Sequence, residues 1–155
     1  KADDVVSYTV SQSDLYEDYR RRKVFGISYE KTWFYNVHFS WEDDLYDSFA
    51  DQWSRFMKVI QKPCFVAGDF NIQSKGQAYQ NIQLYDAYTL ADKPKGSATV
   101  VGEIDGWENS YEEKRIDYIF TSEKQSVLDY RVVFNGIDGP VISDHYGVSV
   151  TFKDK

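Results

Sequence analysis

Four short segments of the chain set polar side chains beside apolar ones. The residue types are Asp, Asn and His: carboxylate and amide oxygens bind hard divalent cations, and imidazole exchanges protons near neutral pH. Together they raise the question of a phosphate or metal site. The segments are YNVHFSW with His38, GDFN with Asp69 and Asn71, KRIDYIF with Asp117, and ISDHYGV with Asp144 and His145.

The tetrapeptide GDFN follows the apolar run 63–67 and has two interpretations. Gly, Asp and Asn are common at strand-to-loop turns because they tolerate unusual backbone angles. Alternatively, Asp69 and Asn71 are alternate positions of an extended segment, so their side chains point to one side and could bind a phosphate or a metal. Taken alone, the tetrapeptide favours the turn.

The other three segments also have structural interpretations. A lone His in an aromatic strand is usually structural, an Asp between apolar residues is usually ion-paired, and Ser-Asp-His before a strand could be a turn. The chain has only 2 His residues, however, and both lie beside apolar strands in such segments. Their joint presence favours one shared functional site.

The motifs GDFN, RIDYIF and SDHYGV, in this order and after a His in YNVH, resemble the endonuclease/exonuclease/phosphatase superfamily, which has the DNase I-like fold. The resemblance covers nearly the whole chain, residues 5–152. The segments TVVGEIDGWENSYEEKRIDYIF and RRKVFGI further resemble a bacterial branch that includes maltose 6′-phosphate phosphatases. The resemblance implies a phosphoric ester hydrolase that uses Mg²⁺ (or Mn²⁺).

The family mechanism gives these residue types roles. Water attacks a phosphate ester in line while negative charge grows on its oxygens, and a divalent cation and positioned acid–base groups assist. The resemblance implies that Asp69 orients or deprotonates the water and that Asp69 and Asp144 contribute to the metal site. It also implies that Asn71 and His145 donate hydrogen bonds to the phosphoryl group.

Two more roles come from the same resemblance. Asp117 would accept a hydrogen bond from the other ring nitrogen of His145 and fix its orientation, as carboxylates do for many catalytic imidazoles. His38 matches a His found in DNases and sphingomyelinases, and is a candidate acid for the leaving oxygen.

Composition and charge fit one folded domain. The chain has 155 residues, of which 42% are hydrophobic and 17% aromatic, far from a disordered profile. Its net charge of −7 argues against broad electrostatic binding of nucleic acid. Cys64 lies in an apolar run, where we expect it to be buried, and a single Cys allows no intrachain disulfide. No run of about 18 apolar residues occurs, so we expect no membrane partner.

The hydrophobic pattern predicts an α/β domain with much antiparallel pairing. Residues 45–60 repeat apolar side chains every three or four positions, which predicts an amphipathic helix with Asp43 and Asp44 at its start. A short helix is expected within residues 72–90. Seven strands are expected, at residues 5–10, 23–30, 32–39, 64–68, 115–122, 127–135 and 146–153.

Charge and aromatic residues bear on the substrate. The basic run RRRK (20–23) has two interpretations: it attracts phosphate, or it is a solvated segment at the start of a strand. Trp41 and Trp107 also have two: they stack on a sugar ring of the substrate, or they pack in the protein as structural aromatic residues. Together with the negative net charge, these features favour a sugar phosphate over duplex DNA as the substrate. Such a substrate and the single Cys favour a cytoplasmic location. The alternatives are a phosphodiesterase of the same superfamily, such as a nuclease or sphingomyelinase, and a non-catalytic partner-binding domain.

One part of the family pattern is unmatched. The family carries a further metal-related Asn and Glu before the His-bearing strand, and residues 1–37 supply neither convincingly. We therefore expect residues 1–155 to be the C-terminal half of a DNase I-like four-layer α/β sandwich. Such a fragment should bind its cation weakly and have little or no activity. It should also expose an apolar sheet face, and self-associate or pair with the missing N-terminal half.

Overall fold

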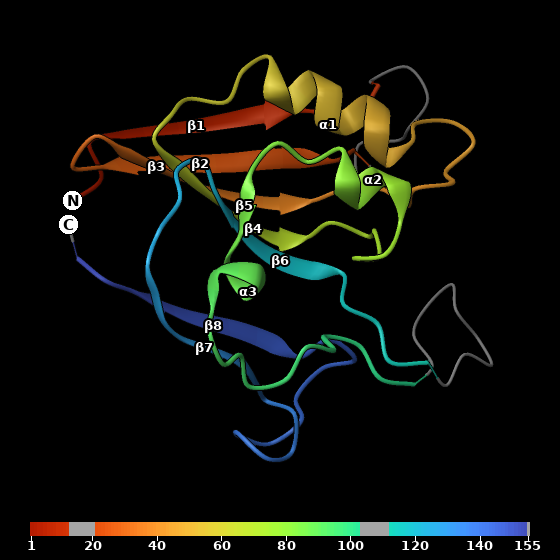
Figure 1. The fold of residues 1–155 in the computed structure, drawn as a ribbon. Helices are drawn as coiled ribbons and strands as arrows, with labels where there is room; N and C mark the ends of the chain where they lie inside the picture. Colours follow the sequence, from red (N-terminus) through yellow and green to blue (C-terminus); the bar gives the residue numbers. More distant parts are fainter. Residues whose placement is uncertain (13–20, 103–111, 155) are drawn as a thin grey trace.

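The computed structural model describes residues 1–12, 21–102 and 112–154, which form three layers (Figure 1). The central layer is a six-stranded sheet of order β1-β2-β3-β4-β6-β5, in which β3 and β4 are parallel and the other neighbours antiparallel. This mixed sheet with helices confirms the predicted fold class. The strands are β1 (Asp4–Thr9), β2 (Lys23–Tyr29), β3 (Thr32–His38), β4 (Cys64–Asp69), β5 (Tyr85–Asp86) and β6 (Asp117–Thr121).

Helix α1 (Phe49–Met57) covers one face of this sheet (Figure 1). In β3, Trp33, Tyr35 and Val37 alternate toward that face and are buried, as the period of two in a strand requires. Each fully buried apolar side chain of this size contributes about 1.5–3 kcal/mol. Cys64 belongs to the same core, which confirms its predicted burial.

Helix α1 is shorter than the helix predicted at residues 45–60. It begins after Ser48, whose hydroxyl accepts a hydrogen bond from the amide three residues later and caps the helix. Just before this cap, the Asp44 carboxylate accepts hydrogen bonds from two following amides and forms a turn. The prediction of Asp43 and Asp44 at the helix start was therefore wrong, and Leu45 is 94% exposed rather than on the core face.

A buried polar network fixes the segment between β3 and α1, which carries Trp41. The Gln52 side chain accepts from the Ser40 amide at 3.0 Å and donates to the Ser40 hydroxyl at 2.9 Å and to Asp47 Oδ2 at 3.0 Å. The Arg55 guanidinium donates to the other oxygen of Asp47. Because these buried polar groups satisfy one another, the segment is held in one conformation.

The third layer is an antiparallel pair, β7 (Val127–Val133) and β8 (Gly147–Phe152). It lies on the side of the central sheet opposite α1 (Figure 1). Phe152 packs against Phe65 of β4, with 5.1 Å between the ring centroids. Helix α3 (Ala87–Leu90) completes this second core.

Residues 72–90 contain more than the single short helix predicted there. They form two single-turn helices, α2 (Gln77–Gln80) and α3, with the two-residue strand β5 between them. The Asp86 carboxylate accepts from the Tyr88 amide at 2.9 Å, which ends β5 and caps α3. The seven predicted strands are present, with ends within two residues of those expected. Within the described part of the chain, no helix is long and apolar enough to cross a membrane.

The face of β1, β2 and β3 that points away from α1 is apolar and exposed. Val5, Phe25 and Phe34 lie on it and are 55%, 50% and 41% exposed. Phe34 also stacks on Phe65, with 5.2 Å between ring centroids. This face therefore continues the surface on which β8 packs.

Candidate functional site

Three predicted site residues lie side by side at one end of the central sheet. In the β3–β4 pairing His38 is opposite Asp69, and in the β4–β6 pairing Asp69 is opposite Asp117. Partners directly opposite each other on neighbouring strands share a face of the sheet, so these side chains come from distant positions to one place. His38 Nε2 is 3.4 Å from Asp69 Oδ2.

The GDFN segment forms a turn that directs the side chains of Asp69 and Asn71 toward a pocket. The Asn71 amide donates to Asp69 Oδ1 at 2.8 Å, and Asn71 has a φ of 51°, a left-handed conformation that Asn tolerates. The Asn71 side chain donates to the Phe39 carbonyl oxygen at 2.8 Å and is therefore fixed. Gly68 has a φ of 140°, and a Cβ there would collide with the Val37 carbonyl oxygen, so the turn requires glycine.

A short backbone seam brings His145 to this end of the sheet. Val100 forms an isolated β-bridge with His145, and the Tyr146 amide donates to the Thr99 carbonyl oxygen at 2.7 Å. The Thr99 hydroxyl in turn accepts from the Asp117 amide at 3.2 Å. Thr99 and Val100 are fully buried, so the seam holds the His145 segment against the start of β6.

His145 and Asp117 form a hydrogen-bonded pair, with 2.9 Å between Nδ1 and Oδ2. The bond raises the pKa of His145 because the carboxylate stabilises the protonated imidazole, while partial burial opposes the rise. Since Nδ1 is engaged by Asp117, Nε2 is the ring atom that can meet a ligand in the pocket.

Asp69 is a strongly perturbed carboxyl group. Its pKa is raised to about 6, first by burial and then by the charge of Asp117, while the Asn71 amide, His145 and Arg22 oppose the rise. Asp69, Asp117 and His145 each place a potential ligand atom within 4.8 Å of the others. Two close carboxylates with an imidazole suit a hard divalent cation, which would relieve the repulsion that raises the pKa of Asp69.

A pocket of about 220 Å³ opens at this end of the sheet. Asp117 is hydrogen-bonded to His145 but is not among the residues that line the pocket. The described residues that line the pocket are Arg22, His38, Trp41, Asp69, Asn71, Asp144 and His145. The structure thus brings the predicted polar residues together around one cavity.

Arg22 is a pocket residue that the sequence did not single out. Its backbone is fixed just before β2, because its amide donates to the Ser11 hydroxyl and its carbonyl accepts from the Val10 amide, both at 2.9 Å. Its positive charge lowers the pKa of both Asp69 and His38. A guanidinium is a strong partner for phosphate oxygens. The basic run was the only sequence signal, and it did not show which Arg faces the cavity.

His38 and Asp144 lie at the rim. The His38 side chain is 58% exposed. Its pKa is lowered, first by the partial desolvation of the ring and then by the charges of Arg22 and His145, so it is unprotonated at neutral pH. Asp144 is exposed and accepts from the Ser143 hydroxyl at 3.0 Å. It lines the pocket but lies outside the three-residue group around Asp69.

Of the two tryptophans predicted to bind substrate, one is described. Trp41 lines the pocket and packs against Val100 and Ile116. Trp107 lies outside the described residues.

The mixed sheet carries a pocket at one end where Asp, Asn, His and Arg side chains meet. The chain belongs to the Endonuclease/Exonuclease/phosphatase family, whose family model matches residues 4–145. Enzymes of this family are hydrolases that use divalent metal ions, and membership confirms the resemblance seen in the motifs.

Solved structures show the same fold. A family member from Leptotrichia buccalis C-1013-b is 27% identical with a TM-score of 0.80, and the match covers 99% of this chain and 62% of that one. A mannosyl-6-phosphatase from Bacteroides thetaiotaomicron VPI-5482 is 20% identical with a TM-score of 0.70, covering 99% and 67%. A 3′ phosphatase from Neisseria bound to a product DNA hairpin is 18% identical with a TM-score of 0.68, covering 99% and 72%. The last two share the fold alone, and a comparison with curated protein sequences found no match.

Proposed function

We propose that the protein is a divalent-metal-dependent phosphomonoesterase that acts on a sugar phosphate such as maltose 6′-phosphate. The observation that carries the proposal is the pocket in which Arg22 and His145 face the carboxylate of Asp69. Two cationic or proton-donating groups beside a general base can bind a phosphoryl group and activate water against it.

The environment of each side chain supports one role. Asp69 is ionised above about pH 6 and takes a proton from the attacking water. His145, whose pKa Asp117 raises, donates from Nε2 to a phosphoryl oxygen. Arg22 and the second amide hydrogen of Asn71 bind the remaining phosphoryl oxygens.

His38 is the proposed acid for the leaving oxygen. Because its pKa is lowered, it is neutral at pH 7 and must receive a proton before it can donate one. Asp69 Oδ2 is 3.4 Å from His38 Nε2, which is a short path for the proton that Asp69 has removed from water. The proton then passes to the leaving oxygen, and Asp69 is ionised again.

Mg²⁺ (or Mn²⁺) would be held by the carboxylates of Asp69 and Asp144, with an oxygen of Asp117 nearby. When bound, such a cation polarises the phosphoryl group and offsets the charge that grows on its oxygens. The fit is supported by the closeness of Asp69, Asp117 and His145, whose potential ligand atoms lie within 4.8 Å of one another, and by the charge of Asp117, which adds to burial in raising the pKa of Asp69.

A phosphodiesterase or nuclease is the second candidate, because similar structures include a 3′-5′ exonuclease from Neisseria meningitidis. The net charge of −7 favours a small substrate over a polyanion. The sugar-phosphate proposal also draws support from the mannosyl-6-phosphatase among the similar structures.

Hydrolysis with Mg²⁺ tests the proposal, measured as phosphate release for the monoesters, as strand nicking for plasmid DNA and as phosphocholine release for sphingomyelin. Maltose 6′-phosphate and mannose 6-phosphate should be hydrolysed faster than a 3′-phosphorylated oligonucleotide, plasmid DNA or sphingomyelin. Asp69→Asn and His145→Ala should each lower kcat by roughly 10²–10⁴-fold, the usual range for an acid–base group. Asp92→Asn removes the same charge at an exposed loop and should leave the rate unchanged. Faster hydrolysis of the DNA or lipid substrates would favour the second candidate.

We also propose that residues 1–155 alone bind the cation weakly and turn over slowly, because the family's further Asn and Glu are unmatched in residues 1–37. The apolar face of β1 to β3 supports self-association, or pairing with an N-terminal half. A cytoplasmic location fits the buried, unpaired Cys64 and a phosphorylated metabolite as substrate.

A further inference from the structure

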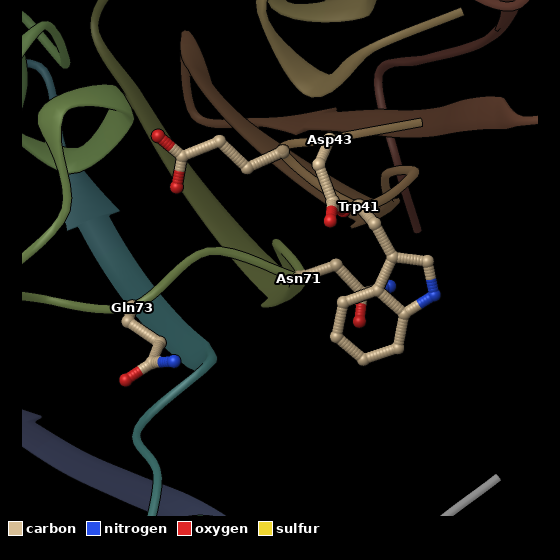
Figure 2. Close-up of a pocket in the computed structure, with 5 residues that line it drawn as sticks. Trp41, Asp43, Asn71 and Gln73 are labelled. Atoms are coloured by element: carbon tan, nitrogen blue, oxygen red, sulfur yellow. The ribbon is translucent and has the colours of Figure 1, made fainter. Parts of the chain in front are cut away.

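A second pocket lies beside the phosphoryl pocket. It has a volume of about 270 Å³ and is lined by Trp41, Glu42, Asp43, Asn71 and Gln73 (Figure 2). Trp41 and Asn71 line both pockets, so the two are contiguous. A substrate with its phosphoryl group in the first pocket must place its leaving group next to it, and the second pocket is such a place.

The walls of the second pocket are held by contacts within the protein. They come from residues 41–43, after β3, and residues 71–73, after β4. The Glu42 Oε1 accepts from the Ala78 amide at 3.2 Å, which ties the first wall to helix α2. In Figure 2 the Asp43 carboxylate points toward the second wall, where Asn71 lies. A preformed pocket loses little entropy on binding a small ligand.

The lining suits a neutral ring with many hydroxyl groups. The indole of Trp41 offers a flat apolar surface to the C–H face of a sugar, and carboxylate and amide oxygens accept hydrogen bonds from hydroxyls. The described residues that line the pocket include no Lys or Arg. The carboxylates of Glu42 and Asp43 therefore oppose a second phosphate or a nucleic-acid strand there.

We infer that this second pocket is a leaving-group subsite that binds one neutral sugar ring and excludes polyanions. Its volume of about 270 Å³ is below the range of about 300–1,000 Å³ of pockets for drug-sized ligands, which fits a single ring. The inference rests on the proposed function of the neighbouring phosphoryl pocket. Asp43 is then a specificity residue, because its charge favours hydroxyl donors and opposes phosphate groups.

Binding to the metal-free chain tests the subsite without requiring turnover. Affinities for maltose and for a short single-stranded DNA at low ionic strength are measured by NMR titration. Trp41→Ala should weaken maltose binding about tenfold, equal to about 1.4 kcal/mol. The matched control Tyr29→Ala removes an exposed aromatic ring at the β2–β3 turn and should change nothing.

Charge removal gives a second, opposite readout. Asp43→Asn should weaken maltose binding and strengthen DNA binding, each by roughly threefold, because the exposed carboxylate accepts hydrogen bonds from sugar hydroxyls and repels phosphate groups. Asp92→Asn changes the net charge equally, away from the pocket, and should affect neither ligand. Unchanged maltose binding in both pocket variants, or equal shifts for Asp43→Asn and Asp92→Asn, would overturn the subsite.

Inorganic phosphate with Mg²⁺ separates this result from the proposed function. Its binding, followed by the ring signals of His145, reports on the phosphoryl pocket alone. Phosphate binding without maltose binding would overturn the subsite and leave the phosphatase proposal in place. Maltose binding that depends on Trp41, without phosphate binding even at Mg²⁺ concentrations that saturate a weak site, would support a sugar site and contradict the phosphatase proposal.

Discussion

Replacing Asp69 by Asn should stabilise the metal-free protein at neutral pH while lowering kcat by roughly 10²–10⁴-fold. The pKa of Asp69 is raised from 3.8 to about 6 by burial and by Asp117, so the folded state holds this proton more tightly than the unfolded state does. The carboxyl group therefore favours folding below about pH 4, and this stabilisation is lost as the pH rises to about 6. At pH 7 the ionised group destabilises the fold.

The magnitude follows from the shift. Two pKa units correspond to about 3 kcal/mol, since each unit is about 1.4 kcal/mol. The 2.8 Å bond from the Asn71 amide to Asp69 lowers this pKa and is already part of the shift, so it needs no separate deduction. The expectation is that Asp69→Asn raises the free energy of unfolding by about 3 kcal/mol at neutral pH.

The assay is urea unfolding of both proteins in EDTA at several pH values. The variant should be more stable by about 3 kcal/mol near pH 7.5 and by about 1 kcal/mol near pH 4.5, and the advantage should vanish near about pH 3, where the carboxyl group is protonated in both the folded and the unfolded state. Asp92→Asn serves as the control because its carboxylate is exposed. A variant that is less stable at pH 7.5, or a difference that does not change with pH, would refute the reasoning.

Three further predictions concern other parts of the molecule. The rate of phosphate release should rise with pH along an acid limb at or below about pH 6, as Asp69 ionises, and fall at higher pH as His145 loses its proton. Asp117→Asn should move the alkaline limb to lower pH, because Asp117 raises the pKa of His145. An unmoved alkaline limb would contradict the pairing of Asp117 with His145. Asp47→Ala should lower the free energy of unfolding by about 3 kcal/mol, because it leaves Gln52 and Arg55 without their buried carboxylate partner. The control Asp92→Ala should change the free energy of unfolding by less than about 0.5 kcal/mol. The isolated chain should self-associate in sedimentation velocity and Phe34→Ser should reduce this; a wild-type monomer at high concentration would rule it out.

The strands could be predicted because their signal is local. Alternating large apolar residues such as Trp33, Tyr35 and Val37 mark a strand with one buried face wherever the chain folds. The same local logic located the motifs at strand ends. It failed at residues 45–60, where the periodicity continued past the helix but the Asp44 carboxylate bonded backbone amides and formed a turn.

The site was only partly predictable for a related reason. Asp69, Asn71 and His145 stand in recognisable motifs, so their types and order were informative. The seam through Thr99 and Val100 joins segments far apart in the chain, and nothing in residues 99–100 alone indicates it. The position of Arg22 likewise depends on hydrogen bonds to the end of β1, which a basic run does not reveal.

Paramagnetic broadening by Mn²⁺ tests most directly whether these residues form a cation site, because it detects even weak binding. Amide signals of residues 68–71, Asp117 and residues 144–145 should broaden first in the 155-residue chain, and Asp69→Asn should abolish the effect. Broadening centred on other exposed acids, such as Asp129, or unaffected by Asp69→Asn, would contradict the proposed metal-dependent phosphoesterase site.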